Sequence, residues 1–176
     1  SVAWALNAVG SALGTVGRPE PALRAEQEAL GLARQLDDGV LMFTLLNNIA
    51  THRHRAGQLD AAERCYREAL GLARRHAGRV GNVVVLDNLI RVLVARGELK
   101  QARQFAVECL PLARHEKVSV DLLEATVGLA SRGGEHAIAA RFWGAADRQL
   151  LAWRYRHEPG ELEHNAPLIA HSRRAL

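Results

Sequence analysis

The pattern of apolar and polar positions along this 176-residue chain repeats at a fixed distance. The segment Ala-Leu-Gly-Leu-Ala-Arg at residues 29–34 returns unchanged at residues 69–74, and a near copy, Cys-Leu-Pro-Leu-Ala-Arg, occupies residues 109–114. Successive copies therefore lie 40 residues apart, and each repeat fits two helices joined by a turn. A unit of this length cannot bury its apolar face alone and must stack on its neighbours. The pattern predicts a stack of helical hairpins.

Glycine marks the predicted turn inside each hairpin. The four turn glycines are Gly17, Gly57, Gly97 and Gly134. Their spacing is 40 residues between the first three and 37 to the fourth, a drift that is usual for a terminal repeat. Because glycine tolerates a positive φ angle, it can end a helix in the left-handed conformation. We therefore expect one helix to end at each of these glycines and another to begin just after it.

Small side chains recur at fixed distances from the turn glycines. Five residues after the glycines stand Ala22, Ala62, Ala102 and Ala139. Twelve residues after them stand Ala29, Ala69, Cys109 and Ala146. We expect these residues where paired helices touch, because small side chains let two backbones approach. The space between hairpins should be filled by the residues eight positions before the glycines, which are Val9, Ile49, Leu89 and, more weakly, Thr126.

This set of positions resembles the tetratricopeptide repeat. The residues that carry the resemblance are Leu46, Ile49, Ala50, Gly57, Leu59, Ala62, Tyr66 and Ala69. It covers about residues 3–150, with a repeat of 40 residues where that family usually has about 34. The resemblance implies an all-α fold, a right-handed α-α superhelix of about four helical hairpins. In repeats of this type the first helix of each hairpin lines a concave groove.

The chain is expected to form repeats over residues 1–155 and capping helices over residues 156–176. The four hairpins are predicted at about residues 1–38, 39–78, 79–117 and 118–155. Trp143 and Trp153 could close the stack by packing on the last hairpin, since a solenoid needs a capped end. A helical pattern starts directly after Ser1 with no initiator methionine, so we expect a piece of a longer protein.

Polar residues follow the same repeat on the predicted first helices. Ten residues before the turn glycines stand Asn7, Asn47, Asp87 and Glu124. Along the groove they would form a ladder of hydrogen-bonding groups. By the same spacing the groove should receive Thr51, His54, Arg55 and Arg91, together with Trp4, Thr44 and Arg132. Tetratricopeptide domains hold extended peptides with asparagine and cationic side chains at such positions. The alternative is that Asn7, Asn47 and Asn48 hydrogen-bond only between neighbouring helices.

Charge and candidate chemistry narrow the function further. The net charge is +4, and 21 of the 23 cationic residues are arginine. Acids are interspersed among them, which favours charge pairs on helix surfaces over a direct nucleic-acid site. His52 and His54 lie on opposite sides of a helix and cannot share a metal ion. The sequence has no phosphate-binding loop and no nucleophile elbow. We expect a protein that is not an enzyme and uses no cofactor or metal.

The cysteines and the hydropathy indicate a compartment. Cys65 and Cys109 have no companion ligands, so they form neither a disulfide framework nor a zinc site. Both stand at positions that suit buried packing. No apolar run approaches the roughly 18 residues that a membrane span needs, and no signal-peptide pattern occurs. We expect a cytoplasmic protein.

Residues 134–146, Gly-Glu-His-Ala-Ile-Ala-Ala-Arg-Phe-Trp-Gly-Ala-Ala, carry a second resemblance. They are similar to the segment that closes the helical region of large bacterial signalling ATPases, including LuxR-type transcriptional activators. The resemblance implies a sensor or interaction domain with a protein, a peptide or a small-molecule inducer in its groove. The alternatives are a free-standing scaffold and a regulatory segment of a nucleotide cyclase or protein kinase. Exposed apolar faces would allow a homodimer.

Overall fold

The computed structural model describes residues 1–112, 116–152, 167, 170–172 and 174. All regular structure in this part of the chain is helical, as predicted, and it contains no strand. The chain divides into two compact units, Ser1–Val85 and Leu86–Leu176. Among the described helices, none combines the length and apolar character that crossing a membrane requires.

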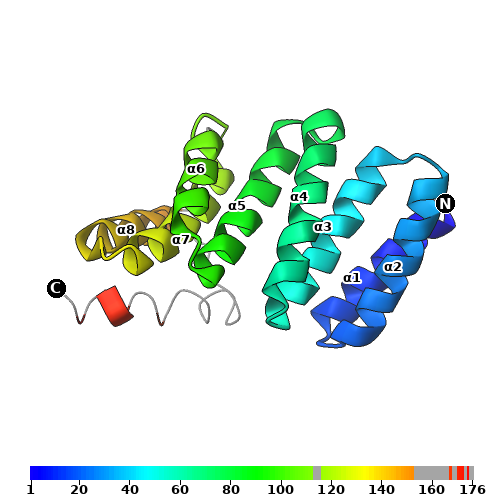
Figure 1. Cartoon of the computed structure of the whole chain (residues 1–176), viewed down its shortest axis with the longest axis horizontal. Coiled ribbons are helices and arrows are strands. Elements are labelled where there is room, and N and C mark those ends of the chain that lie inside the picture. Colours follow the sequence, from blue (N-terminus) through cyan, green and yellow to red (C-terminus); the bar gives the residue numbers. More distant parts are fainter. Residues whose placement is uncertain (113–115, 153–166, 168–169, 173, 175–176) are drawn as a thin grey trace. The chain divides into compact units, whose positions relative to one another are not determined.

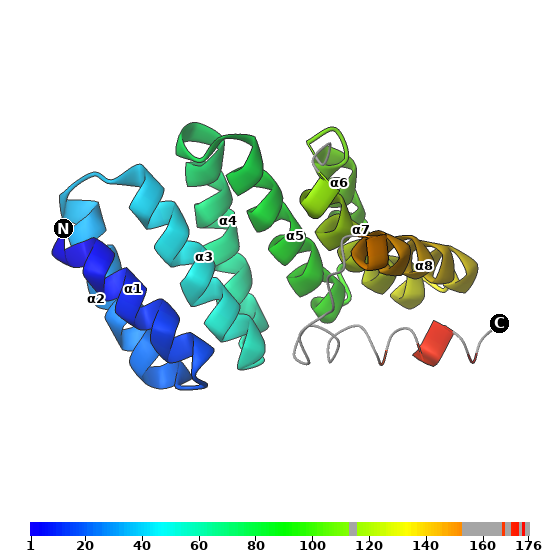
Figure 2. The same cartoon turned by 180° about the vertical axis from the view of Figure 1, so that it is seen from behind.

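The first unit contains two helical hairpins and the beginning of a fifth helix. Its helices are α1 (Val2–Thr15), α2 (Pro19–Gln35), α3 (Gly39–Arg55) and α4 (Leu59–His76), followed by the start of α5 (Gly78–Arg96). Helix α1 packs on α2 and α3 packs on α4, while α2 also contacts α3 (Figures 1 and 2). Two successive hairpins therefore stack through the second helix of one and the first helix of the next.

The second unit repeats this arrangement. It contains the rest of α5, then α6 (Leu99–Cys109), α7 (Glu116–Arg132) and α8 (His136–Ala152). Helices α7 and α8 form a packed hairpin, and α6 contacts α7. The predicted tetratricopeptide-like helical repeat is therefore confirmed as packed pairs of adjacent helices.

The four turn glycines adopt the conformation that the sequence predicts. Gly17, Gly57, Gly97 and Gly134 all have φ between +73° and +79°. In each turn the amide that follows the glycine donates to a carbonyl in the last turn of the preceding helix. Gln58 N, for example, lies 2.9 Å from Arg53 O, and Glu135 N lies 2.8 Å from Ala130 O. These bonds satisfy carbonyls that a helix end would otherwise leave without a partner.

The linker between the first two hairpins ends α2 without a glycine. Asp37 there takes a left-handed conformation with φ of +53°. The next residue, Asp38, accepts a hydrogen bond from Leu41 N at 2.9 Å through its side chain and so caps α3. Asp37 thus takes the left-handed conformation that glycine takes in the other turns, and Asp38 is the capping residue of the next helix.

The predicted helix contacts are confirmed at the small residues. Both sets of small side chains are almost fully buried, with exposed fractions of 1% or less, at Ala22, Ala62, Ala102, Ala139, Ala29, Ala69, Cys109 and Ala146. Ile49 and Leu89 are buried as expected. The prediction that Val9 fills space between hairpins is wrong, because its side chain is 51% exposed.

The last hairpin is closed partly by its own aromatic residues. Phe142 and Trp143 of α8 pack against a buried cluster of Val127, Ala130 and Ala139, which confirms the prediction for Trp143. Trp153 and most of the predicted capping segment 156–176 lie outside the described residues. Within that segment, Ser172 is buried and its hydroxyl donates to the Ser131 hydroxyl at 2.9 Å.

Candidate interaction surfaces

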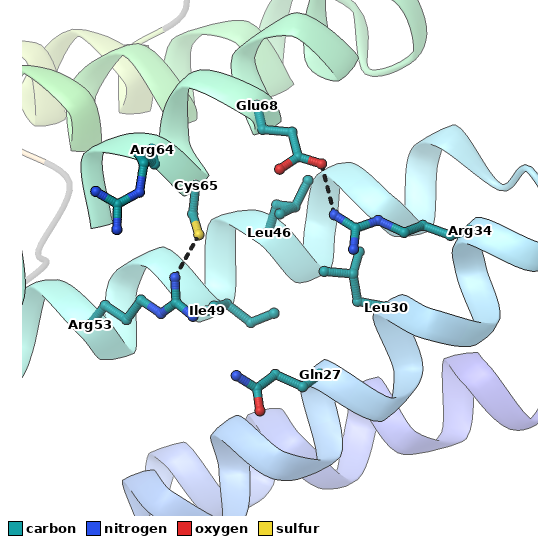
Figure 3. A pocket seen from close by; sticks show the side chains of 9 residues that line it. All are labelled: Gln27, Leu30, Arg34, Leu46, Ile49, Arg53, Arg64, Cys65 and Glu68. Carbon is teal, nitrogen blue, oxygen red and sulfur yellow. Dashed lines mark hydrogen bonds and ion pairs between the residues drawn. The ribbon is translucent and has the colours of Figure 1, made fainter. Parts of the chain in front are cut away.

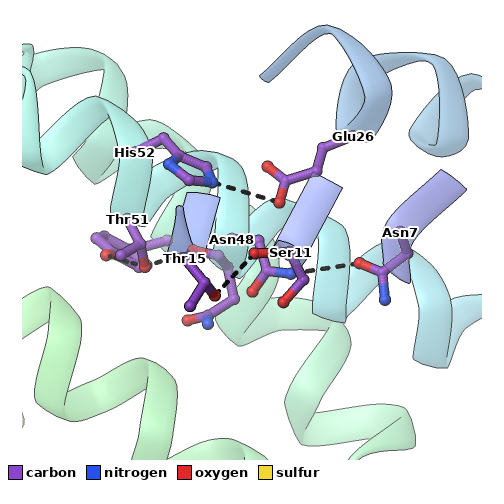
Figure 4. A network of polar contacts seen from close by, with 9 residues as sticks. Asn7, Ser11, Thr15, Glu26, Asn48, Thr51 and His52 are labelled. Carbon is purple, nitrogen blue, oxygen red and sulfur yellow. Dashed lines mark hydrogen bonds and ion pairs between the residues drawn. The ribbon is translucent and has the colours of Figure 1, made fainter. Parts of the chain in front are cut away.

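Asn7, one of the two asparagines predicted to line a groove, lies at a contact between hairpins. Asn48 Nδ2 on α3 donates to Asn7 Oδ1 on α1 at 3.3 Å, and both side chains are half-buried (Figure 4). Asn47, the neighbour of Asn48, is also half-buried and makes contacts of its own. Asn7 and Asn48 therefore join two first helices, which is the packing role that the sequence left open.

Thr51 connects the two helices of the second hairpin. Its hydroxyl lies 3.0 Å from the hydroxyl of Tyr66 on α4, and it donates to the Asn47 carbonyl at 2.9 Å. Tyr66 is fully buried, so its hydroxyl needs this partner. The last turn of α3 is more open, since His54 is half-buried and Arg55 is exposed. Arg55 is the candidate groove residue of this helix that solvent reaches most freely.

The candidate residues of the second unit form a buried charge network. Arg91 Nε donates to Asp87 Oδ2 at 2.9 Å within α5, and Arg91 Nη2 lies 3.6 Å from Glu124 Oε2 on α7. Asp87 and Glu124 are only 7% and 6% exposed. Burial raises the pKa of Asp87, and the adjacent Arg91 opposes that shift. These three side chains link two first helices, as Asn7 and Asn48 do in the first unit.

A buried acid that the sequence did not single out lies beside this contact in the first unit. Glu26 of α2 has no exposed surface, and its Oε1 lies 3.4 Å from His52 Nε2 on α3 (Figure 4). Desolvation raises the pKa of Glu26 from its ordinary value of 4.5 to about 7. Burial and the charge of Arg55 lower the pKa of His52. Both changes favour the neutral forms of the two side chains.

Two glycines of α1 make room for this pair. A Cβ added at Gly10 would lie 2.6 Å from Glu26 Cγ, and one added at Gly14 would lie 2.6 Å from His52 Cε1. The sequence carried a signal for this feature, because two glycines four residues apart lie on one face of a helix. Glycine inside a helix lowers its stability relative to alanine, so two such glycines on one face indicate that a neighbouring group occupies the space of their side chains.

A pocket opens on the other side of α3, between the second helices of the two hairpins. Its volume is about 440 Å³. Its lining comes from three helices (Figure 3), with Gln27, Leu30 and Arg34 from α2, Leu46, Ile49 and Arg53 from α3, and Arg64, Cys65 and Glu68 from α4. The repeated segment at residues 29–34 thus contributes two lining residues, Leu30 and Arg34. Sequence reasoning missed the pocket because it looked for a site on the first helices.

The two ends of the pocket differ in their polar contacts. At one end Arg34 Nη2 pairs with Glu68 Oε1 at 2.9 Å, bridging α2 and α4. At the other end Arg53 Nη1 donates to Cys65 Sγ at 3.2 Å, with Arg64 close by (Figure 3). Burial raises the pKa of the Cys65 thiol, although Arg53 and Arg64 oppose that shift. The sulfur is therefore uncharged at neutral pH and does not neutralise Arg53.

Both cysteines are free and buried, in agreement with the packing positions that the sequence indicated. Burial raises the pKa of Cys109 to about 12, and the nearby carboxylates of Asp87 and Glu108 add to the shift. In the described part of the chain no three His, Cys, Asp or Glu side chains gather as a metal site would require.

Comparison with known proteins identifies the central repeats. Residues 41–115 match the tetratricopeptide repeat family. The matching segment begins two residues into α3 and includes α4, α5 and α6, so it contains nearly all of the second hairpin and the two helices that follow it. No curated protein matches the chain. Tetratricopeptide repeats generally mediate protein–protein interaction, and an all-helical repeat fold of this kind is typical of non-enzymatic interaction domains.

Proposed function

We propose that this chain is a peptide-binding interaction domain and that it serves as the sensor part of a multidomain bacterial transcriptional regulator. The family match over residues 41–115 carries the first half of the proposal, because repeats of this family bind proteins. Helix α3, most of which lies in the matching segment, presents an amide at Asn47, an imidazole at His54 and a guanidinium at Arg55. Those groups suit the carbonyls and carboxylates of an extended peptide.

The candidate groove residues would divide their work between binding and packing. Asn7, Thr51, Arg91 and Glu124 contact other helices, and Asp87 pairs with Arg91, so these residues would hold the first helices in place. Asn47, His54 and Arg55 would supply direct contacts to a ligand, Asn47 and His54 in addition to the contacts that they already make within the protein. A ligand that favours one arrangement of neighbouring hairpins could pass that preference to an attached domain by shifting a conformational equilibrium. The same mechanism would serve a small-molecule inducer.

The regulator context rests on the resemblance at residues 134–146. This segment contains the last turn glycine and the first part of α8, including the aromatic pair Phe142 and Trp143. Sequencing the reading frame beyond Ser1 and Leu176 tests the context. The proposal expects an ATP-binding loop upstream and a helix-turn-helix downstream. A frame that carries neither would leave a scaffold, and cyclase or kinase motifs would assign the chain to an enzyme's regulatory arm.

Peptide binding can be tested without knowing the natural partner. A random dodecapeptide library displayed on phage is selected against the purified chain, and the best peptide is titrated by calorimetry. Asn47→Ala with Arg55→Ala should weaken its affinity about tenfold or more, since each lost charged or bidentate contact is worth roughly a factor of ten. Gln58→Ala with Arg75→Ala removes one amide and one cation elsewhere and should leave the affinity unchanged. Equal affinity for both double variants would contradict the proposal.

A further inference from the structure

The pocket between α2, α3 and α4 goes beyond the proposed function, because it lies on a different face of α3 from the candidate groove. The pocket residues of this helix are Leu46, Ile49 and Arg53, which follow helical spacing along one face. Asn47 and His54 are each displaced by one residue from this stripe, which turns them about 100° around the helix. A ligand in the pocket therefore need not touch the groove candidates.

Arg53 occupies a position at which the neighbouring repeats have an apolar residue. Forty residues before and after it, the equivalent positions hold Leu13 and Leu93. Leu93 is fully buried in its own unit, so the repeat can fill this place with an apolar side chain. Arg53 is half-buried and directs its guanidinium to Cys65 instead (Figure 3). A charge here is thus a departure from the repeat that helix packing alone does not require.

The pocket holds more positive than negative charge. Its lining includes three guanidinium groups, those of Arg34, Arg53 and Arg64, and one carboxylate, that of Glu68. Arg34 pairs with that carboxylate, whereas neither Arg53 nor Arg64 forms a salt bridge within the part of the chain that the structure describes. The Arg34–Glu68 pair is about half exposed on both sides, so it is weakly held and screened. The electrostatic complement of this pocket is an anion at the Arg53 end.

The floor of the pocket selects among anions. It is formed by Leu30, Leu46 and Ile49, between the two polar ends (Figure 3). A volume of about 440 Å³ exceeds what a single inorganic anion fills and falls within the range of small ligand pockets. A glutamate side chain combines both requirements, since its methylene groups can cover an apolar floor while its carboxylate reaches a guanidinium. Nucleic-acid backbones are a poorer match, because they need a longer stripe of cations.

We infer that this pocket is a second docking site that receives a glutamate side chain of an acidic peptide segment from a partner protein. The carboxylate binds Arg53 and Arg64, and the side-chain methylenes lie over Leu30, Leu46 and Ile49. Arg34 and Glu68 border the site and stay paired with each other. A partner could then engage the groove candidates and the pocket through two different segments.

A pair of synthetic peptides tests the inference on the full chain. One is a fluorescein-labelled dodecapeptide that alternates Glu with Gly and Ser, and the other has Gln in place of every Glu. The Glu peptide should bind with a dissociation constant below about 1 mM and at least tenfold more tightly than the Gln peptide. Its binding should shift the δ1 methyl signal of Ile49 in an NMR spectrum of isoleucine-labelled protein. No binding of the Glu peptide at 1 mM would overturn the inference.

Two charge-matched variants separate the pocket from the general positive charge of the protein. Arg53→Leu with Arg64→Gln removes the two cations of the pocket that form no salt bridge in the described part of the chain, and leucine is the residue that neighbouring repeats have at the first of these positions. Arg75→Gln with Arg79→Gln removes two exposed charges that do not line the pocket. The first variant should lose tenfold or more in affinity for the Glu peptide, and the second less than twofold. Equal losses would overturn the inference, as would an unchanged Ile49 signal in the wild-type protein.

Two further probes exclude other anions. Inorganic phosphate at 10 mM should displace little of the Glu peptide, because it cannot cover the apolar floor. A single-stranded oligonucleotide of twelve thymidines should bind more weakly than the peptide. If phosphate competes fully, or if the oligonucleotide binds more tightly and depends on Arg53, the site is an anion or nucleic-acid site and the peptide assignment is overturned.

Discussion

Gly10 of α1 lies against the buried side chain of Glu26 on α2, so closely that a Cβ at Gly10 would come within 2.6 Å of Glu26 Cγ. The carbonyl of Ala22 would be 3.3 Å away on the other side. Neither neighbour can retreat easily, because Glu26 is fully buried and Ala22 belongs to the helix backbone. The close approach of α1 to α2 therefore depends on the absence of a side chain at this position.

Gly10→Ala should destabilise the protein by about 1–3 kcal/mol, because it overpacks a contact that has no free space. The matched control is Gly31→Ala, also within a helix, where nothing lies within 4 Å of the added Cβ. That change should stabilise by about 0.5–1 kcal/mol through the better helix propensity of alanine. Urea unfolding followed by circular dichroism measures both. If the two variants shift stability in the same direction, the proposed close contact is wrong.

Glu26 should make stability depend on pH in a defined window. Its pKa is about 7 in the folded protein and close to the ordinary 4.5 when unfolded, so the folded state holds the proton more tightly. The contribution of this group is complete below pH 4.5 and is lost as pH rises to about 7. Glu26→Gln keeps the shape and removes the titration. Relative to wild type, this variant should gain stability between pH 5 and 8, reaching roughly 3 kcal/mol.

The control for this pH dependence is Glu28→Gln, which changes an exposed acid on the same helix. This variant should not reproduce the change seen for Glu26→Gln, because it leaves the buried site intact. Burial and Arg55 lower the pKa of His52, so its contribution to stability changes with pH in the opposite direction from that of Glu26, and the wild-type profile alone would mix the two. Only the difference between Glu26→Gln and wild type isolates the acid. A flat difference would show that Glu26 ionises normally in the folded state.

Gly57 tests the role of the turn glycines. Its φ is +73° and no atom lies within 4 Å of an added Cβ, so backbone strain is the sole penalty for a side chain. Gly57→Ala should cost about 1–2 kcal/mol, and Gly57→Asn should cost less because asparagine tolerates the left-handed conformation. Gly71→Ala, in a helical position with open space, should be neutral or stabilising. Thermal unfolding that ranks alanine above asparagine at position 57 would refute this account.

Arg91 should be essential to its buried network. Arg91→Met leaves Asp87 buried without its cation, and breaking a buried pair in this way costs about 3–5 kcal/mol. Adding Asp87→Asn should restore part of that loss, because Asp87 then no longer carries a buried charge without its cation, whereas Glu124 still lacks Arg91. A double-mutant cycle from urea unfolding measures the coupling. If Arg91→Met is as stable as wild type, the network is not structural and the groove role of Arg91 becomes more attractive.

Repetition explains which parts of the fold could be predicted from sequence. The turn glycines and the contact alanines occupy equivalent positions in successive repeats, so each copy supported the others. Glu26 occupies a position that Tyr66 and Ala106 hold in the next two repeats, and all three are buried. The repeat therefore predicts that the side chain at position 26 is buried, but it does not predict that a carboxylic acid occupies this position. A buried acid at this place depends on Gly10 and His52, which the repeats do not share.

The candidate site was harder to predict for a related reason. A polar residue that recurs on the first helices can bind a ligand or can hydrogen-bond to the first helix of the next hairpin. Its spacing in the sequence is the same in both cases. The structure shows Asn7 bound to Asn48 and Arg91 paired with Glu124, contacts that join helices. The pocket departed from the repeat at Arg53, where its neighbours have leucine. A charged residue at a position where the equivalent residues of other repeats are apolar is the sequence signal for this pocket.

The most direct test of the proposed function is an NMR titration of the labelled chain with the peptide selected by phage display. Side-chain amide signals report Asn47, and methyl signals report Ile49, which lies two residues away and so about 200° around the same helix. For a selected peptide without acidic residues, the account predicts that the side-chain amide signal of Asn47 shifts and that the methyl signal of Ile49 does not. An unchanged Asn47 signal at saturating peptide would contradict the assignment of a binding surface to the first helices.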